Sequence, residues 1–145
     1  MPIIVRDACE ACFDAHKDDC SGFVRAVAAS LGVTLQGLAD DIVVTIRTDP
    51  GWRQLPDGNA AAQSAEAGRL VIAGLKGSEQ AHPDPHGHVA VVVDGPVERD
   101  ACPTAYWGSL GGKPGKALTI NFAWTVDDRD HVTYAEHDVA APGTE

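Results

Sequence analysis

The hydrophobic pattern changes partway along the chain, and this change restricts the folds that the chain can adopt. Between Cys20 and Leu31 the apolar residues recur at intervals of three and four, which is the period of an amphipathic α-helix. After Gly68 the apolar segments are short and rich in β-branched residues, at Arg69–Leu75 and His88–Val93, as is typical of buried strands. Helices followed by strands predict an α+β fold in which N-terminal helices pack on an antiparallel sheet.

Weaker patterns extend this prediction to the rest of the chain. Further helices are predicted at Ile3–Ala15, Leu35–Ile46 and Asn59–Ala67. Further strands are predicted at Tyr106–Leu110, Leu118–Trp124 and His131–His137. The segment Val43–Ile46 would suit a strand as well as a helix. The length of 145 residues is that of one domain, and residues 140–145 are expected to form a flexible tail.

The charge and the N-terminus exclude several classes of protein. Acidic residues outnumber basic ones by 21 to 11, which gives a formal net charge of −10 at pH 7. A surface of this charge repels nucleic acid and anionic lipid, so neither is expected as a partner. The N-terminus lacks the basic and apolar regions of a secretory signal. We therefore expect a cytoplasmic protein or one that is exported without a cleaved signal.

Cys20 and His88 are the candidate catalytic residues. Cys20 begins the predicted helix, where free N–H groups and a partial positive charge favour a thiolate and can hold a developing oxyanion. His88 begins the most apolar strand, where it can meet a helix that packs across the sheet. Cysteine and histidine form the usual nucleophile–base pair for acyl transfer. Each residue taken alone would equally suit a buried core position.

A histidine-rich loop offers an alternative. His82, His86 and His88 lie close together in the sequence with Asp84, and such side chains bind zinc. Their spacing matches no standard zinc signature, so no metal and no cofactor are expected. Two rival functions stay open: a non-catalytic protein that binds a metal or ligand with this loop, and an acyltransferase with the same fold.

Several segments resemble a known family. The motif Asp19–Val24, which reads DCSGFV, resembles the nucleophile motif of the NlpC-type cell-wall peptidases, a papain-like superfamily. In that superfamily the catalytic histidine opens a strand, as His88 does in the sequence GHVAVV. Longer stretches are similar to family 1 of the type VI secretion amidase effectors: residues 20–33, 70–77, 87–96, 107–109 and 128–130. The resemblance extends from Asp7 to about Val139.

The resemblance implies a fold, an activity and a setting. The fold would be a single NlpC-like, papain-like domain over residues 1–145. The activity would be a cysteine amidase that cleaves peptidoglycan peptide stems between γ-D-glutamate and meso-diaminopimelate. Effectors of this family are antibacterial toxins that the type VI secretion apparatus delivers to the periplasm of a target bacterium. A periplasmic immunity protein protects the producing cell.

The resemblance also implies roles for individual residues. Cys20 would be the nucleophile and His88 the base, and Ser21 and Trp107 would support the oxyanion and the catalytic pair. The group that orients the imidazole stays open between the hydroxyls of Tyr106 and Ser109 and a backbone carbonyl near Trp107. The segment from 78 to 87 is expected to overhang the cleft as a hairpin extension. The expected residues of the cleft rim are His86, Gly87 and Ser109.

Overall fold

A computed structural model describes residues 3–99 and 101–139, and its elements confirm the α+β class. The described residues form four α-helices: α1 (Ile3–His16), α2 (Cys20–Ser30), α3 (Ala39–Thr48) and α4 (Gly58–Glu66). They also form six strands: β1 (Arg53–Leu55), β2 (Leu70–Leu75), β3 (His88–Glu98), β4 (Cys102–Trp107), β5 (Gly115–Thr119) and β6 (Thr133–His137). No helix among them is both long and apolar enough to span a membrane. The tail expected at 140–145 lies outside the described residues.

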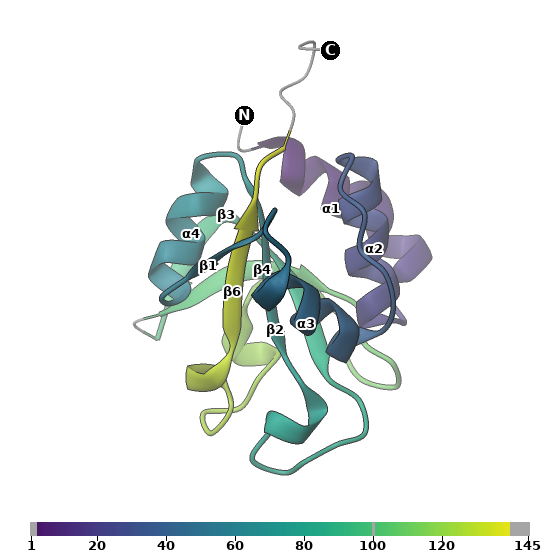
Figure 1. Cartoon of the computed structure of the whole chain (residues 1–145), viewed down its shortest axis with the longest axis vertical. Helices are drawn as coiled ribbons and strands as arrows, with labels where there is room; N and C mark the ends of the chain where they lie inside the picture. Colours follow the sequence, from purple (N-terminus) through teal and green to yellow (C-terminus); the bar gives the residue numbers. More distant parts are fainter. Residues whose placement is uncertain (1–2, 100, 140–145) are drawn as a thin grey trace.

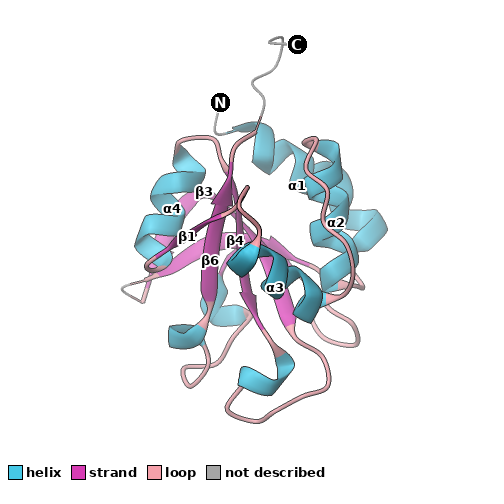
Figure 2. Ribbon diagram, viewed as in Figure 1, coloured by secondary structure: helices cyan, strands magenta, loops and turns pink. Residues whose placement is uncertain are grey.

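The strands form one antiparallel sheet in the order β1-β6-β2-β3-β4-β5 (Figure 2). The strands β2 and β3 lie at its centre, where Ile72 pairs with Val91 and Leu75 pairs with His88. The last strand, β6, lies between the edge strand β1 and the central strand β2, so the end of the described chain is paired on both sides. The pairing with Leu75 places His88 where the paired part of β3 begins.

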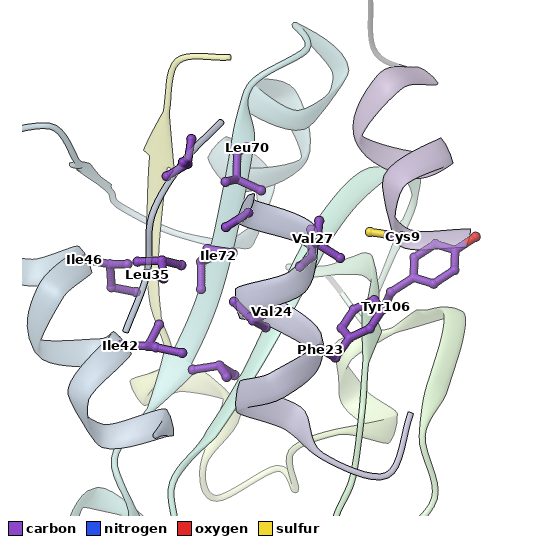
Figure 3. Packing of buried hydrophobic residues seen from close by; sticks show 14 of the residues in the cluster. Cys9, Phe23, Val24, Val27, Leu35, Ile42, Ile46, Leu70, Ile72 and Tyr106 are labelled. Carbon is purple, nitrogen blue, oxygen red and sulfur yellow. The ribbon is translucent and has the colours of Figure 1, made fainter. Parts of the chain in front are cut away.

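Helices cover both faces of the central strands, which explains why those strands are apolar without alternation. In Figure 1, α4 stands on one side of the strands and α1 and α2 stand on the other. The larger core joins α1, α2 and α3 to one face of the sheet, and Figure 3 shows its residues Phe23, Val24, Val27, Ile42, Leu70 and Ile72. The second core joins α4 to the opposite face and contains Ala61, Ala65, Ala73, Ala90, Trp107 and Trp124.

The segment Leu118–Trp124 is not the single strand that its alternating pattern predicts. The strand β5 ends at Thr119, and Ile120–Phe122 forms a 3₁₀ turn, η2. The backbone N–H of Trp124 donates to the carbonyl of Ile120 at 2.9 Å, which turns the chain. Phe122 is 66% exposed, whereas Trp124 is only 4% exposed. The alternation therefore comes from a tight turn that buries Trp124 in the second core.

The structure confirms the helix predicted before Asp49 over its strand alternative and shifts one predicted strand. The segment Val43–Ile46 is helical and belongs to α3, whose buried side chains face the sheet. The strand predicted at Tyr106–Leu110 begins earlier and ends at Trp107, as β4. The short strand β1 was not predicted from the sequence; it lies at the edge of the sheet and its residues are mostly exposed.

The end of β4 is held against the turn that precedes α2. The backbone N–H of Ser109 donates to the carbonyl of Lys17 at 2.8 Å. A Cβ atom on Gly108 would lie 2.5 Å from the carbonyl oxygen of Asp19 and 2.7 Å from that of His16. Because both obstacles are backbone atoms, a side chain at position 108 would force the strand and the turn apart. This contact fixes where α2 begins relative to the sheet.

Replacement of Gly108 by alanine is therefore expected to lower the free energy of unfolding by about 1–3 kcal/mol, the usual cost of overpacking. Chemical denaturation measures this change. Gly51→Ala is the matched control, because the closest atoms to its Cβ would be side-chain atoms of Asp49 and His137, both at 3.2 Å. Equal stability of the two variants would show that the contact at Gly108 is not close-packed.

Candidate active site

Cys20 is the first residue of α2, and no side-chain cap occupies the N–H groups at this end of the helix. Asp19 is the N-cap residue, but its side chain makes no hydrogen bond to the helix backbone. Its Oδ1 instead accepts a hydrogen bond from the Ser21 hydroxyl at 3.0 Å. The first N–H groups of the helix are therefore left without a side-chain cap. Because the Ser21 hydroxyl is engaged, support of an oxyanion from this residue has to come from its backbone N–H.

Cys20 meets the start of β3. Its Sγ lies 4.0 Å from the carbonyl oxygen of Gly87, the residue that precedes His88. Cys20 and His88 both line one cavity of about 670 Å³. Nearly half of the chain separates these two residues in the sequence, and the fold brings them to the same cavity. Within the described residues, no hydrogen bond joins the Cys20 thiol to the His88 ring.

The Cys20 thiol is protonated at neutral pH. Burial raises its pKa above the ordinary value, and the nearby Asp19 carboxylate raises it further. The backbone N–H groups of Val89, Ser21 and Cys20 lower the pKa only in part. The N–H groups at the helix start thus favour a thiolate in direction, but desolvation has the larger effect on the pKa in the free protein. Nucleophilic attack by Cys20 requires a base.

His88 is suited to be that base. Burial lowers the pKa of His88 to about 4, so the imidazole is neutral at neutral pH and can accept a proton. Its ring contacts Trp107, with centroids 6.4 Å apart, and Trp124, with centroids 5.1 Å apart; both contacts are edge-to-face. Trp107 therefore lies where support of the site was expected. The contact of Trp124 with His88 was not predicted from the sequence, because its apparent place in an alternating strand concealed the turn.

The hydroxyl of Tyr106 does not orient His88. It donates a hydrogen bond to Glu10 of α1, and Lys116 lies 3.3 Å from the same carboxylate. Figure 3 shows the Tyr106 hydroxyl at the edge of the larger core, beside α1. His88 contacts Trp107 and Trp124 of the other core. Tyr106 thus serves to fasten α1 to the sheet.

Two cavities adjoin at His88. The cavity beside Cys20 measures about 670 Å³, and the cavity beside Trp107 and Trp124 measures about 380 Å³. Five residues line both: Asp84, His86, Gly87, His88 and Ser109. All three residues predicted for the cleft rim are therefore found at the boundary between the cavities. A cleft with space on both sides of a reactive pair suits an extended substrate that is cleaved in its interior.

The loop between β2 and β3 forms the shared wall of this cleft and is fastened by two carboxylates. Asp40 Oδ1, at the start of α3, accepts a hydrogen bond from the Gly77 N–H at 3.0 Å. Asp128 Oδ1 accepts one from the Ala81 N–H at 2.7 Å. Asp128 is buried, and this role was not predicted from the sequence. These two hydrogen bonds hold the loop in place beside His88.

The same loop carries the histidines of the alternative metal site. Among the described residues, no group of three or more His, Cys, Asp or Glu side chains is placed to hold a metal ion. This includes His82, His86 and His88, which are all described. Glu79, at the start of the loop, is paired with Arg47 of α3 through hydrogen bonds of 2.8 and 2.9 Å. The metal-binding alternative therefore has no geometric support.

Comparison with known proteins supports the resemblance seen in the motifs. No family model matches the sequence. The chain is 40% identical over 130 residues to a protein named peptidoglycan amidase Tse1 from Pseudomonas aeruginosa. The aligned region covers 87% of this chain and 79% of that relative. Because the identity and the coverage are both high, the chain belongs to the family of type VI secretion amidase effectors.

Proposed function

We propose that the protein is a cysteine amidase that hydrolyses the peptide stems of peptidoglycan. The observation that carries this proposal is the meeting of Cys20, at the N-terminus of α2, with Gly87 and His88 at the start of β3. The meeting point lies where the two cavities adjoin. The related protein is a peptidoglycan amidase by name, which supports the same substrate class.

The reaction begins from a neutral pair. His88 takes the thiol proton as the Cys20 sulfur attacks the amide carbonyl, and the N–H groups at the start of α2 stabilise the oxyanion. The protonated His88 then gives its proton to the departing amine, which leaves a thioester on Cys20. A water molecule, deprotonated by His88, attacks the thioester and releases the carboxylate product. The thiol regains its proton from His88.

The scissile bond that we propose joins γ-D-glutamate to meso-diaminopimelate, in a papain-like fold. The charges of the cleft support a substrate of this kind. Carboxylates line the cavity beside Cys20: Asp19, Asp40, Asp41 and Asp84. Lys113 lines the other cavity. Asp84 and Asp128 line that cavity too. A peptide stem carries both amino and carboxylate groups, so its amino groups have partners of opposite sign in both cavities and its carboxylates have one in Lys113.

We further propose delivery by the type VI secretion apparatus, action in the periplasm of a target bacterium, and inhibition by a cognate immunity protein. Exposed apolar side chains at the cleft support a protein partner there. Leu38 and Leu110 line the cavity beside Cys20 and are 58% and 78% exposed. Phe122 lines the other cavity and is also exposed. Exposed apolar groups around a cleft favour the docking of another protein.

Cys20→Ala and His88→Ala are each expected to abolish release of amines from purified peptidoglycan while the far-UV circular dichroism stays unchanged. The double variant should be no less active than either single variant, because nucleophile and base act as one unit. Cys12→Ala is the control for a partly buried cysteine outside the cleft, and it should keep full activity. Hydrolysis by Cys20→Ala would refute the mechanism.

The pH dependence of kcat/KM is expected to show an acid limb with a midpoint at about pH 4, because burial lowers the pKa of His88 to about 4. The neutral base predominates above that pH and is lost below it. Soluble peptidoglycan fragments serve as the substrate, and circular dichroism at each pH separates titration from unfolding. An acid midpoint near the ordinary histidine pKa of about 6.5 would contradict a buried imidazole.

Activity is expected to be insensitive to a strong chelator, because the proposed mechanism uses no metal. His82→Ala tests the rival assignment of the loop, and it should leave hydrolysis of a small stem peptide unchanged. Elemental analysis of the purified protein accompanies both assays. Loss of activity in the chelator that zinc restores, together with the same loss in His82→Ala, would favour the metal-binding alternative.

A further inference from the structure

The His88 ring has no polar partner in the part of the chain that the structure describes. No hydrogen bond from a described residue reaches either ring nitrogen, and the Tyr106 hydroxyl is bound to Glu10. A histidine that acts as a base has to be held in one orientation, and many Cys–His and Ser–His enzymes use a polar third residue for this purpose. Here the ring contacts are made by indoles.

Trp124 makes the closer of the two indole contacts. The ring centroids of His88 and Trp124 are 5.1 Å apart and the ring planes meet at 67°, whereas the centroid of Trp107 is 6.4 Å from that of His88. Trp124 is 4% exposed, and the turn η2 fixes its backbone through the hydrogen bond to Ile120. Trp124 is thus a rigid side chain that lies against the imidazole.

Trp124 occupies this place at a cost to stability. Its Nε1 is buried and has no hydrogen-bond partner among the described residues. A buried donor without an acceptor is unfavourable, and a phenylalanine would fill an apolar site without that penalty. By contrast, the Nε1 of Trp107 donates to the carbonyl of Lys113 at 3.3 Å. An unsatisfied indole beside a candidate base indicates that its position serves the site.

We propose that Trp124 is a positioning residue for His88, whose indole ring fixes the orientation of the imidazole and shields it from water. The inference rests on the proposed role of His88 as the base. Trp124 touches no reacting atom and acts through His88 alone. Edge-to-face packing of an indole here replaces the hydrogen bond that a polar third residue would provide.

The shielding has an electrostatic consequence. Burial is the cause of the lowered His88 pKa, and removal of the indole admits water to the ring. The pKa of His88 should then rise toward its ordinary value. The titratable groups that line the two cavities around His88 are Asp19, Cys20, Asp40, Asp41, Asp84, His86, Lys113 and Asp128. They remain in place in Trp124 variants, so a change in pKa reports hydration of the ring.

The chain offers a matched control. Trp52 packs against His137 with centroids 5.0 Å apart and ring planes at 64°, nearly the same geometry as that of Trp124 and His88. Trp52 is also buried, but it lines neither cavity of the cleft. Trp52→Leu and Trp124→Leu therefore remove equivalent indole–imidazole contacts, one outside the cleft and one within it.

The test measures kcat, KM and the acid midpoint of kcat/KM on peptidoglycan fragments for Trp124→Leu, Trp124→Phe and Trp52→Leu. Trp124→Leu should lower kcat by about 10- to 100-fold, part of the ~10²–10⁴-fold that general acid–base catalysis supplies, with KM nearly unchanged. Its acid midpoint should move upward from about 4. Trp124→Phe should recover most of kcat, and Trp52→Leu should retain both kcat and the midpoint.

A second measurement does not depend on activity. The His88 ring is titrated by NMR in a Cys20→Ala background. Its pKa should be higher when Trp124 is replaced by leucine or by phenylalanine, and the two replacements give two chances of a folded protein. Unchanged kcat and unchanged His88 pKa in Trp124→Leu would overturn the inference, as would an equal loss of kcat in Trp52→Leu. Activity retained by His88→Ala would instead overturn the proposed function.

Discussion

The site depends on a contact between backbone atoms. Gly108, at the end of β4, lies against the carbonyl groups of His16 and Asp19, and the adjacent Ser109 N–H is bonded to Lys17. This contact determines where α2 begins, and with it the position of Cys20 over the start of β3. The larger core of α1, α2 and α3 then holds the helix on the sheet. Catalytic geometry here follows from the close approach of strand and turn.

Burial sets the chemistry of the proposed catalytic pair. It raises the pKa of Cys20 and lowers the pKa of His88, so both shifts favour neutral groups. A thiolate–imidazolium ion pair would require the opposite shifts. In the proposed mechanism the proton moves from sulfur to nitrogen only when the substrate arrives, and burial among aromatic rings keeps the imidazole neutral until then. The desolvated cleft makes hydrogen bonds to the developing oxyanion stronger than they would be in water.

Periodicity and motif spacing predicted much of the architecture. The helical period from Cys20 and the apolar strands after Gly68 are local signals, and they located α2, β2 and β3 within a few residues. Trp124 could not be placed in the same way, because the alternating apolar residues before it indicated a strand where the chain forms a 3₁₀ turn. Its contact with His88 joins residues far apart in the chain.

The net shift in the pKa of Cys20 could not be predicted from the sequence for a related reason. The helix N-terminus is visible in the sequence, but the depth of burial is a property of the whole fold. Asp128 is a similar case: its short sequence context is that of an exposed turn, and only the position of the loop at Ala81 reveals the hydrogen bond. Local signals fixed the elements, whereas long-range packing set the properties of the site.

The protonated state of Cys20 also affects how fast this residue is oxidised. Oxidants and disulfides react with thiolates far more readily than with thiols, so a buried thiol of raised pKa is oxidised slowly. Cys20 is partly buried, whereas Cys9 and Cys102 are buried in the core. A cysteine that keeps its proton until a base removes it is oxidised more slowly than a permanent thiolate would be.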